Sequence, residues 1–89
     1  MNDKISSLEE LYARLLPALK AKQSELHKDH MIYITPKDIW HYFRVNKWNR
    51  VVNLTLFDMV EDILNTDNEA IDLFVRRHKE RQMKEENEE

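Results

Sequence analysis

Two groups of side chains in this sequence are of types that carry out chemistry in proteins, and the first is a pair of histidines. His27 and His30 lie three residues apart, so both imidazoles could face one side of a helix. A metal site needs more than two ligands, and no third ligand is evident beside this pair. We therefore interpret the pair as positive charge near the C-terminal end of a helix, and we predict no metal site.

The second group is a stripe of carboxylates formed by Asp58, Glu61 and Asp62. Neighbouring carboxylates act as general acids and bases where a pocket shifts the pKa of one of them. The chain contains no Cys and no Gly, so it lacks a thiol nucleophile, a Cys-ligated zinc site and every phosphate-binding loop that depends on Gly. We therefore interpret the stripe as the solvated side of a helix, and we expect no enzymatic activity and no cofactor.

A third group has the composition of a binding surface. Both tryptophans lie in one short stretch, with cations interleaved among the aromatic rings and just beyond them. Proteins that bind single-stranded RNA combine these types, because Lys and Arg contact phosphates while bases stack on aromatic rings. A small domain also uses Trp as a core anchor. A core position is favoured over RNA contact for Trp40, whereas the two interpretations are equally favoured for Trp48, whose neighbours are polar or charged. The candidate surface comprises Trp40, His41, Arg44, Lys47, Trp48 and Arg50.

A second cluster of cations runs from Arg76 to Lys84 near the C-terminus. Such a cluster could contact a nucleic acid or a protein. The favoured interpretation is that these cations complement the dipole at the end of a helix and are balanced by the acidic residues that follow.

The first of the elements that must position these groups is a long helix. Ser7 followed by Glu10 has capping-box spacing, and leucines recur on one face after it, which predicts a helix over about 7–27. Pro17 lies inside this range and removes one backbone hydrogen bond, so it should kink the helix or split it.

The helix that bears Trp40 is predicted between two short apolar segments. Thr35 and Asp38 have capping-box spacing, and a proline follows the threonine at the first helical position. The flanking residues Ile32–Ile34 and Val52–Leu54 favour an extended backbone. These two segments would either pair as a minimal two-stranded ribbon or serve as linkers whose side chains fill the core.

Two more helices are predicted after these segments. Residues 56–64 are apolar around most of a helical circumference, so this helix should be the most buried element, with the acidic stripe as its narrow outer face. Thr66 and Glu69 have capping-box spacing and predict the start of a last amphipathic helix. That helix should fray near Arg81, since almost no large apolar residue follows.

These elements predict an all-α domain. The expected architecture is a small bundle of about four helices, in which residues 56–64 lie between the first helix and the Trp-bearing helix. The minimal two-stranded pairing is an optional addition that would flank the second helix. Residues 1–80 are expected to form one domain and residues 81–89 a charged, disordered tail. A chain of 89 residues buries a modest core, so a homodimer would add stability.

Charge and hydropathy indicate where the protein is located and which class of partner it binds. No apolar signal region or run of about 20 apolar residues is present, which predicts a cytoplasmic protein with no membrane insertion. The formal net charge of −3 favours a protein partner over a dedicated nucleic-acid binder. In a helix-turn-helix arrangement the carboxylates of residues 56–64 would face phosphates and repel them, so no DNA binding is expected.

Taken together, the order and spacing of four motifs resemble the ComN-type post-transcriptional regulators of Gram-positive bacteria. The likeness spans about Leu11 to Phe74, and no single motif in it is catalytic. The motifs are Leu16-Pro17-Ala18-Leu19-x-x-Lys22, Tyr33-Ile34-Thr35-x-x-Asp38-Ile39-Trp40, Lys47-Trp48 and Leu56-Phe57-Asp58-Met59-Val60-x-Asp62-Ile63-Leu64.

The resemblance implies a non-enzymatic intracellular regulator that acts after transcription, on genes such as those for late competence and DNA uptake. The surface around the Trp-bearing helix would bind either a protein, such as a coiled-coil scaffold that lays an amphipathic helix into a groove, or single-stranded mRNA. The alternative is an interaction or assembly module, a homodimer or a scaffold-binding adaptor, without direct contact to nucleic acid.

Overall fold

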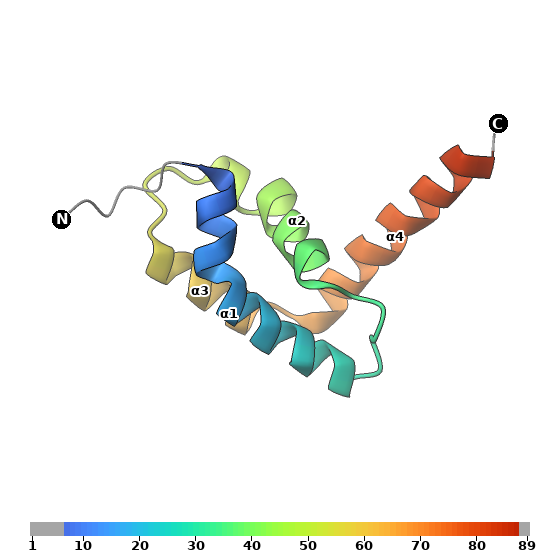
Figure 1. Ribbon diagram of the computed structural model, residues 1–89, viewed down its shortest axis with the longest axis horizontal. Coiled ribbons are helices and arrows are strands. Elements are labelled where there is room, and N and C mark those ends of the chain that lie inside the picture. Colours follow the sequence, from blue (N-terminus) through green and yellow to red (C-terminus); the bar gives the residue numbers. More distant parts are fainter. Residues whose placement is uncertain (1–6, 88–89) are drawn as a thin grey trace.

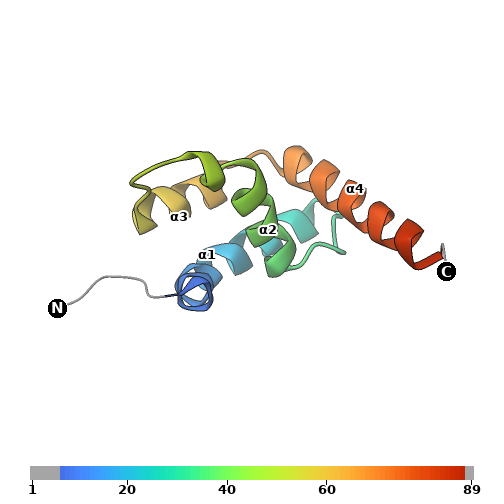
Figure 2. The same ribbon diagram turned by 90° about the horizontal axis from the view of Figure 1, so that it is seen from above.

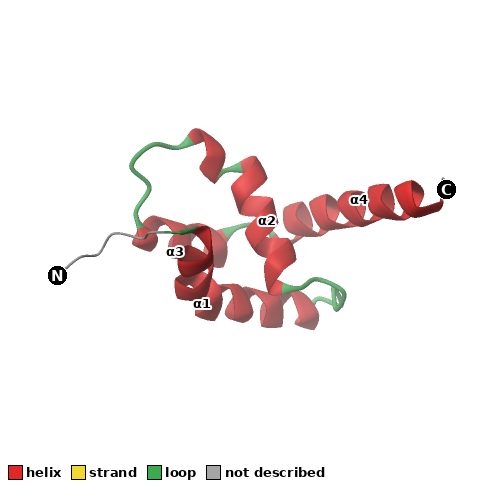
Figure 3. Cartoon of the chain, turned by 45° about the horizontal axis from the view of Figure 1, so that its top comes forward, coloured by secondary structure: helices red, strands yellow, loops and turns green. Residues whose placement is uncertain are grey.

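The computed structural model describes residues 7–87, with side chains described up to residue 81, and this part of the chain is helical with connecting loops (Figures 1 and 3). The predicted all-α fold is confirmed. The elements are α1 (Leu8–Lys28), α2 (Pro36–Asn46), the short 3-10 helix η1 (Trp48–Arg50), α3 (Leu56–Asn65) and α4 (Asn68–Asn87).

Helix α1 begins where its capping signature predicts. The Ser7 side chain accepts a hydrogen bond of 3.1 Å from the Glu10 amide. Pro17 lies inside the helix, which stays continuous but bends along its length (Figure 1). A proline removes a single backbone hydrogen bond, and tertiary contacts on both sides hold the remaining turns, so the helix kinks and does not split.

Helices α2 and α3 begin with the two capping boxes that the sequence predicts. At α2, the Thr35 amide donates to Asp38 Oδ2 over 2.9 Å, while the Asp38 amide donates to Thr35 Oγ1 over 3.2 Å. Thr55 and Asp58 make the same reciprocal pair at α3. Each box satisfies two amides that a helix start otherwise leaves unpaired.

The core forms where α1 packs against both α2 and α3, and where α2 in turn packs against α4. All four α-helices and the loop before α2 contribute fully buried apolar side chains, which lose contact with water and supply most of the folding free energy. These side chains are Leu15, Leu19, Leu26, Ile34, Ile39, Phe43, Ile63, Ile71 and Val75.

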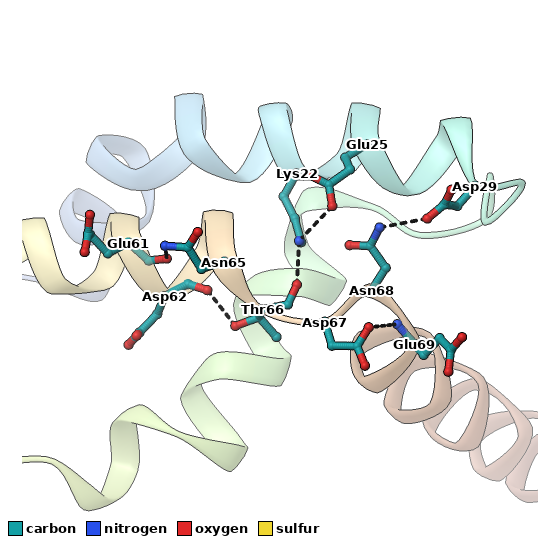
Figure 4. Close-up of polar contacts among 10 residues, drawn as sticks. All are labelled: Lys22, Glu25, Asp29, Glu61, Asp62, Asn65, Thr66, Asp67, Asn68 and Glu69. Carbon is teal, nitrogen blue, oxygen red and sulfur yellow. Dashed lines mark hydrogen bonds and ion pairs between the residues drawn. The ribbon is translucent and has the colours of Figure 1, made fainter.

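One charged side chain lies inside this core and holds the turn between α3 and α4. The Lys22 side chain is 1 % exposed, and its Nζ donates to the main-chain oxygen of Thr66 over 2.6 Å and to Glu25 Oε2 over 3.1 Å (Figure 4). The hydrogen bond from Lys22 lowers the pKa of Glu25, although partial desolvation opposes this shift. Asn68 Nδ2 donates to Asp29 Oδ2 over 2.9 Å and joins the start of α4 to the end of α1.

Helix α3 is not the most buried element, and this prediction is wrong. Ile63 is its only fully buried residue, whereas Phe57 is 69 % exposed and Leu64 is 45 % exposed. The helix packs mainly against α1, while α2 packs between α1 and α4. An apolar circumference shows that a helix has apolar surface to bury, but it does not supply neighbours on every side.

The two predicted extended segments do not pair, and no strand occurs in residues 7–87. The loop before α2 is turned, with the Met31 amide bonded to the Leu26 oxygen, and Asn53 bends the later segment with a φ of 62°. Asn tolerates this left-handed conformation better than most residues. The linker alternative holds in part, because Ile34 is buried and Leu54 packs against the core, while Val52 is 82 % exposed.

The last helix is longer than predicted. Its start is set by Asp67, whose Oδ1 accepts from the Glu69 amide over 3.2 Å, in place of the predicted capping by Thr66. Helix α4 continues to Asn87, beyond the point near Arg81 where fraying is predicted, and it extends away from the other helices (Figure 2). The division into a domain of residues 1–80 and a tail of residues 81–89 stays a prediction.

Candidate binding surface

Trp48 is a core residue and not an exposed contact. It begins η1 directly after α2, and its side chain is 9 % exposed. Its ring stacks on Phe43 with centroids 4.9 Å apart, and its Nε1 donates to Asp62 Oδ2 over 2.9 Å. The polar neighbours of Trp48 in the sequence do not show this, because their side chains are exposed while η1 turns the indole inward.

Trp40 is half-buried and presents part of its ring to solvent. It makes edge-to-face contacts with Tyr12 of α1 at 5.5 Å and with Trp48 at 6.1 Å. The Arg44 guanidinium lies over the Trp40 ring, 5.7 Å from its centroid. A cation and an aromatic face therefore meet on this side of α2.

The remaining predicted surface residues differ in what they contact. Lys47 is exposed, with its Nζ 6.0 Å from the Phe43 ring centroid, and Arg50 is exposed at the end of η1. His41 faces α4, with its ring centroid 5.5 Å from that of Phe74 and 5.0 Å from that of His78. Of the six predicted residues, the structure places one in the core and turns another towards a different helix.

A pocket opens between the start of α1 and α2, and we refer to it as the α1–α2 pocket. Its volume is about 560 Å³, and its surface is mainly apolar. The lining residues are Leu8, Glu9, Tyr12, Lys37, Trp40 and His41. A smaller hollow of about 270 Å³ shares Leu8 and Trp40 with it and reaches Arg44 and Met59. Leu8 and Trp40 thus form the centre of one apolar surface.

A second depression, the α2–α4 groove, lies between α2 and α4. It has a volume of about 340 Å³ and is partly polar. The lining residues are Tyr42, Asn46, Ala70, Leu73, Phe74, Arg77, His78 and Arg81. The sequence shows that the basic cluster and Tyr42 lie on two separate helices. It does not show that they come together, because this depends on how α2 packs against α4.

The carboxylate stripe has structural tasks. Asp58 completes the capping box of α3, and Asp62 accepts a hydrogen bond from the indole N–H of Trp48. The histidines near the end of α1 do not share a helix face, since α1 ends at Lys28 and His30 follows it with a φ of 70°. Among the described residues no group of three or more His, Asp or Glu side chains could hold a metal ion.

Comparison with known proteins adds one finding. A family model described as "Post-transcriptional regulator" matches residues 8–86. Comparisons with curated proteins and with solved structures return no significant match. Within the part of the chain that the structure describes, no helix combines the length and apolarity needed to cross a bilayer. Because the matched range covers most of the chain, the chain belongs to the post-transcriptional regulator family.

Proposed function

We propose that this protein is a non-enzymatic cytoplasmic regulator that acts on genes such as those for late competence and DNA uptake, by binding a protein partner through the α1–α2 pocket. Membership of the post-transcriptional regulator family supports the regulatory role, and the resemblance to ComN-type proteins supports the competence target. The observation that carries the binding mode is an open apolar pocket walled by Leu8, Tyr12 and Trp40.

The walls of the pocket have the character of a protein contact. Leu8 is 53 % exposed and Trp40 is half-buried, so apolar area is available without any rearrangement of the core. Tyr and Trp are enriched among the residues that dominate binding energy, because they offer a large rigid contact area. An amphipathic helix with apolar residues three and four positions apart would fill such a pocket.

Charges around the pocket indicate the chemistry of that helix. Lys37 lies in the lining and Arg44 lies beside it over Trp40, while Glu9 is the one acidic lining residue. A partner helix that carries Asp or Glu beside its apolar residues would complement the two cations. Helices of coiled-coil scaffolds present this combination on their surfaces.

The test is a substitution that blocks the pocket and leaves the fold intact. In a competent Gram-positive host that lacks its own copy, the regulator carries Leu8→Glu, and protein output per transcript is measured for a late-competence reporter. Leu8 is largely exposed, so the substitution should not unfold the domain. Ile32→Glu is the matched control, since Ile32 is also exposed but lies on the loop before α2.

We expect Leu8→Glu to abolish regulation and Ile32→Glu to preserve it. Circular dichroism of both purified variants establishes that they remain helical. Regulation that persists in a folded Leu8→Glu variant would remove the α1–α2 pocket from the mechanism.

The exposed face of α3 favours a second candidate, an assembly module. Phe57 and Leu64 lie one above the other on that face, and Val52 precedes them in the loop. A second copy of the chain could cover these side chains. Sedimentation across protein concentration tests this, with Phe57→Asp expected to hold the protein monomeric, and a wild-type monomer at all concentrations would exclude it.

A further inference from the structure

We infer that the α2–α4 groove is a separate site for a single-stranded segment of RNA, in which Arg77 and Arg81 contact phosphates while bases stack on Tyr42 and Phe74. This site differs from the α1–α2 pocket in position and in chemistry. The inference rests on the proposed post-transcriptional role, but not on the proposed protein contact.

The first support is a division among the cations of α4. Arg76 pairs with Asp72 over 3.3 Å, and Lys79 pairs with Asp38 over 3.5 Å. Arg77 and Arg81 line the groove and form no ion pair with any side chain up to residue 81. Adjacent positions on one helix thus differ in whether their charge is already neutralised.

The second support is the composition of the groove. None of its lining residues is acidic, and Asp67, whose charge acts on the Tyr42 phenol, lies outside the lining, so the two guanidinium groups supply the charge of the groove itself. Arg77 and Arg81 are four residues apart and therefore lie one above the other, about 6 Å apart along the helix axis. This arrangement allows two phosphates of one extended strand to be contacted together.

The third support is a set of rings beside these cations. Tyr42 of α2 and Phe74 of α4 meet edge to face with centroids 5.5 Å apart. The His78 ring lies nearly parallel to that of Phe74, at an interplanar angle of 4°, and its centroid is 6.2 Å away. Bases stack on such rings in proteins that bind single strands, since every base has a flat face.

The rings and the two arginines that line the groove together favour RNA over an acidic peptide. A peptide carboxylate would use the guanidinium groups but would leave the aromatic faces without a flat partner. The net charge of −3 does not oppose the inference, because phosphate contact depends on the local potential of the groove. Two phosphate contacts predict weak binding that weakens further as the salt concentration rises.

The experiment is fluorescence anisotropy of a short labelled oligouridylate titrated with the full chain at several salt concentrations. Each phosphate contact on a single strand contributes about 0.7 to the slope of log affinity against log salt. Arg77→Gln with Arg81→Gln should therefore reduce the slope by about 1.4 and weaken binding at low salt.

Two comparisons isolate the groove. Lys20→Gln with Lys28→Gln removes the same charge from exposed positions of α1 and should leave the affinity within about twofold of wild type. Phe74→Leu should weaken binding by roughly tenfold while leaving the slope unchanged, because stacking is lost and phosphate contact is not. Circular dichroism checks the fold of Phe74→Leu. If that variant unfolds, the substitutions of Arg77 and Arg81 still decide the test, because both positions are exposed and should tolerate replacement.

Leu8→Glu, which blocks the α1–α2 pocket, should leave RNA affinity unchanged, so failure of the protein contact and failure of the RNA site are distinguishable. Absence of RNA binding by the wild type at low salt overturns the inference. If the double lysine variant loses as much RNA affinity as the double arginine variant, the inference is overturned as well, because binding would then depend on overall charge. Displacement of the RNA by an equally tight acidic peptide would assign the groove to a protein.

Discussion

Trp48 Nε1 donates a hydrogen bond of 2.9 Å to Asp62 Oδ2 and thereby joins η1 to α3. One partner comes from the predicted binding surface and the other from the carboxylate stripe that the sequence assigns to the solvated side of a helix. Both side chains are used inside the protein, so neither is free to serve as an exposed contact. The candidate surface therefore lies on the side where Trp40 meets α1 and not at the end of α2.

Trp48→Ala should therefore destabilise the protein strongly. Removing a buried aromatic ring costs about 3–5 kcal/mol of unfolding free energy, and Asp62 also loses its donor. Urea denaturation followed by circular dichroism measures the loss. Trp40→Ala is the comparison and should cost less, because part of its ring is already in contact with water. A larger loss for Trp40→Ala than for Trp48→Ala would contradict this assignment.

Lys22→Met should destabilise the fold even though it removes a buried charge. The substitution keeps most of the apolar stem but leaves the Thr66 carbonyl without its donor, at a cost of about 1–3 kcal/mol. Glu25 remains half-exposed and can return to water. The exposed Lys20→Met should change stability by less than about 0.5 kcal/mol in the same denaturation experiment. Equal effects of the two substitutions would show that the Lys22 contact contributes nothing.

Alkaline pH should weaken the fold through Tyr42. Burial, with a smaller contribution from Asp67, raises the pKa of the Tyr42 phenol above its usual value of about 10. Below that value the phenol is neutral in both states and its stabilisation is fully present. As pH rises from there through the raised pKa, the unfolded chain loses the proton more readily and stability falls.

Tyr42→Phe should accordingly lose less stability than wild type between neutral and strongly alkaline pH, measured as melting temperature against pH. Tyr33→Phe alters an exposed ring and should follow the wild-type curve. Identical curves for Tyr42→Phe and wild type would show that the Tyr42 phenol has no part in the alkaline loss.

Thr35→Ala should lower stability by about 1 kcal/mol. The hydroxyl caps α2 by accepting from the Asp38 amide, and alanine has no acceptor to replace it. Thr35→Ser retains the oxygen and should restore most of the loss. Thermal unfolding of the three proteins provides the measurement, and a serine variant as unstable as the alanine variant would assign the effect to the lost methyl group.

The start signals of α1, α2 and α3 could be predicted because they are local. A capping box involves residues three positions apart, so Thr35 with Asp38 specifies a helix start wherever the helix later packs. The continuous helix through Pro17 and the extent of α4 were less predictable, because neighbouring turns and tertiary contacts decide whether a weakened helix persists.

The candidate site could be predicted only in part. Sequence spacing brings Trp40 and Arg44 together, since they are one helical turn apart, and the structure places the guanidinium over the ring. The spacing does not predict that Leu8 and Tyr12 complete a pocket with Trp40, because these residues come from another helix. The exposed face of α3 was missed for the same reason: a periodic pattern records apolar residues but not the partners available to cover them.

By itself, the sequence determined an all-α fold, the starts of three helices and a family likeness carried by the order of its motifs, because these depend on residues near one another in the chain. Only the tertiary structure decided that Trp48 lies in the core, that Lys22 holds the Thr66 carbonyl, and that Arg77 and Arg81 line a groove beside Tyr42 and Phe74. Each of these depends on the packing of residues from separate helices, and that packing sets which side chains exchange water for a partner.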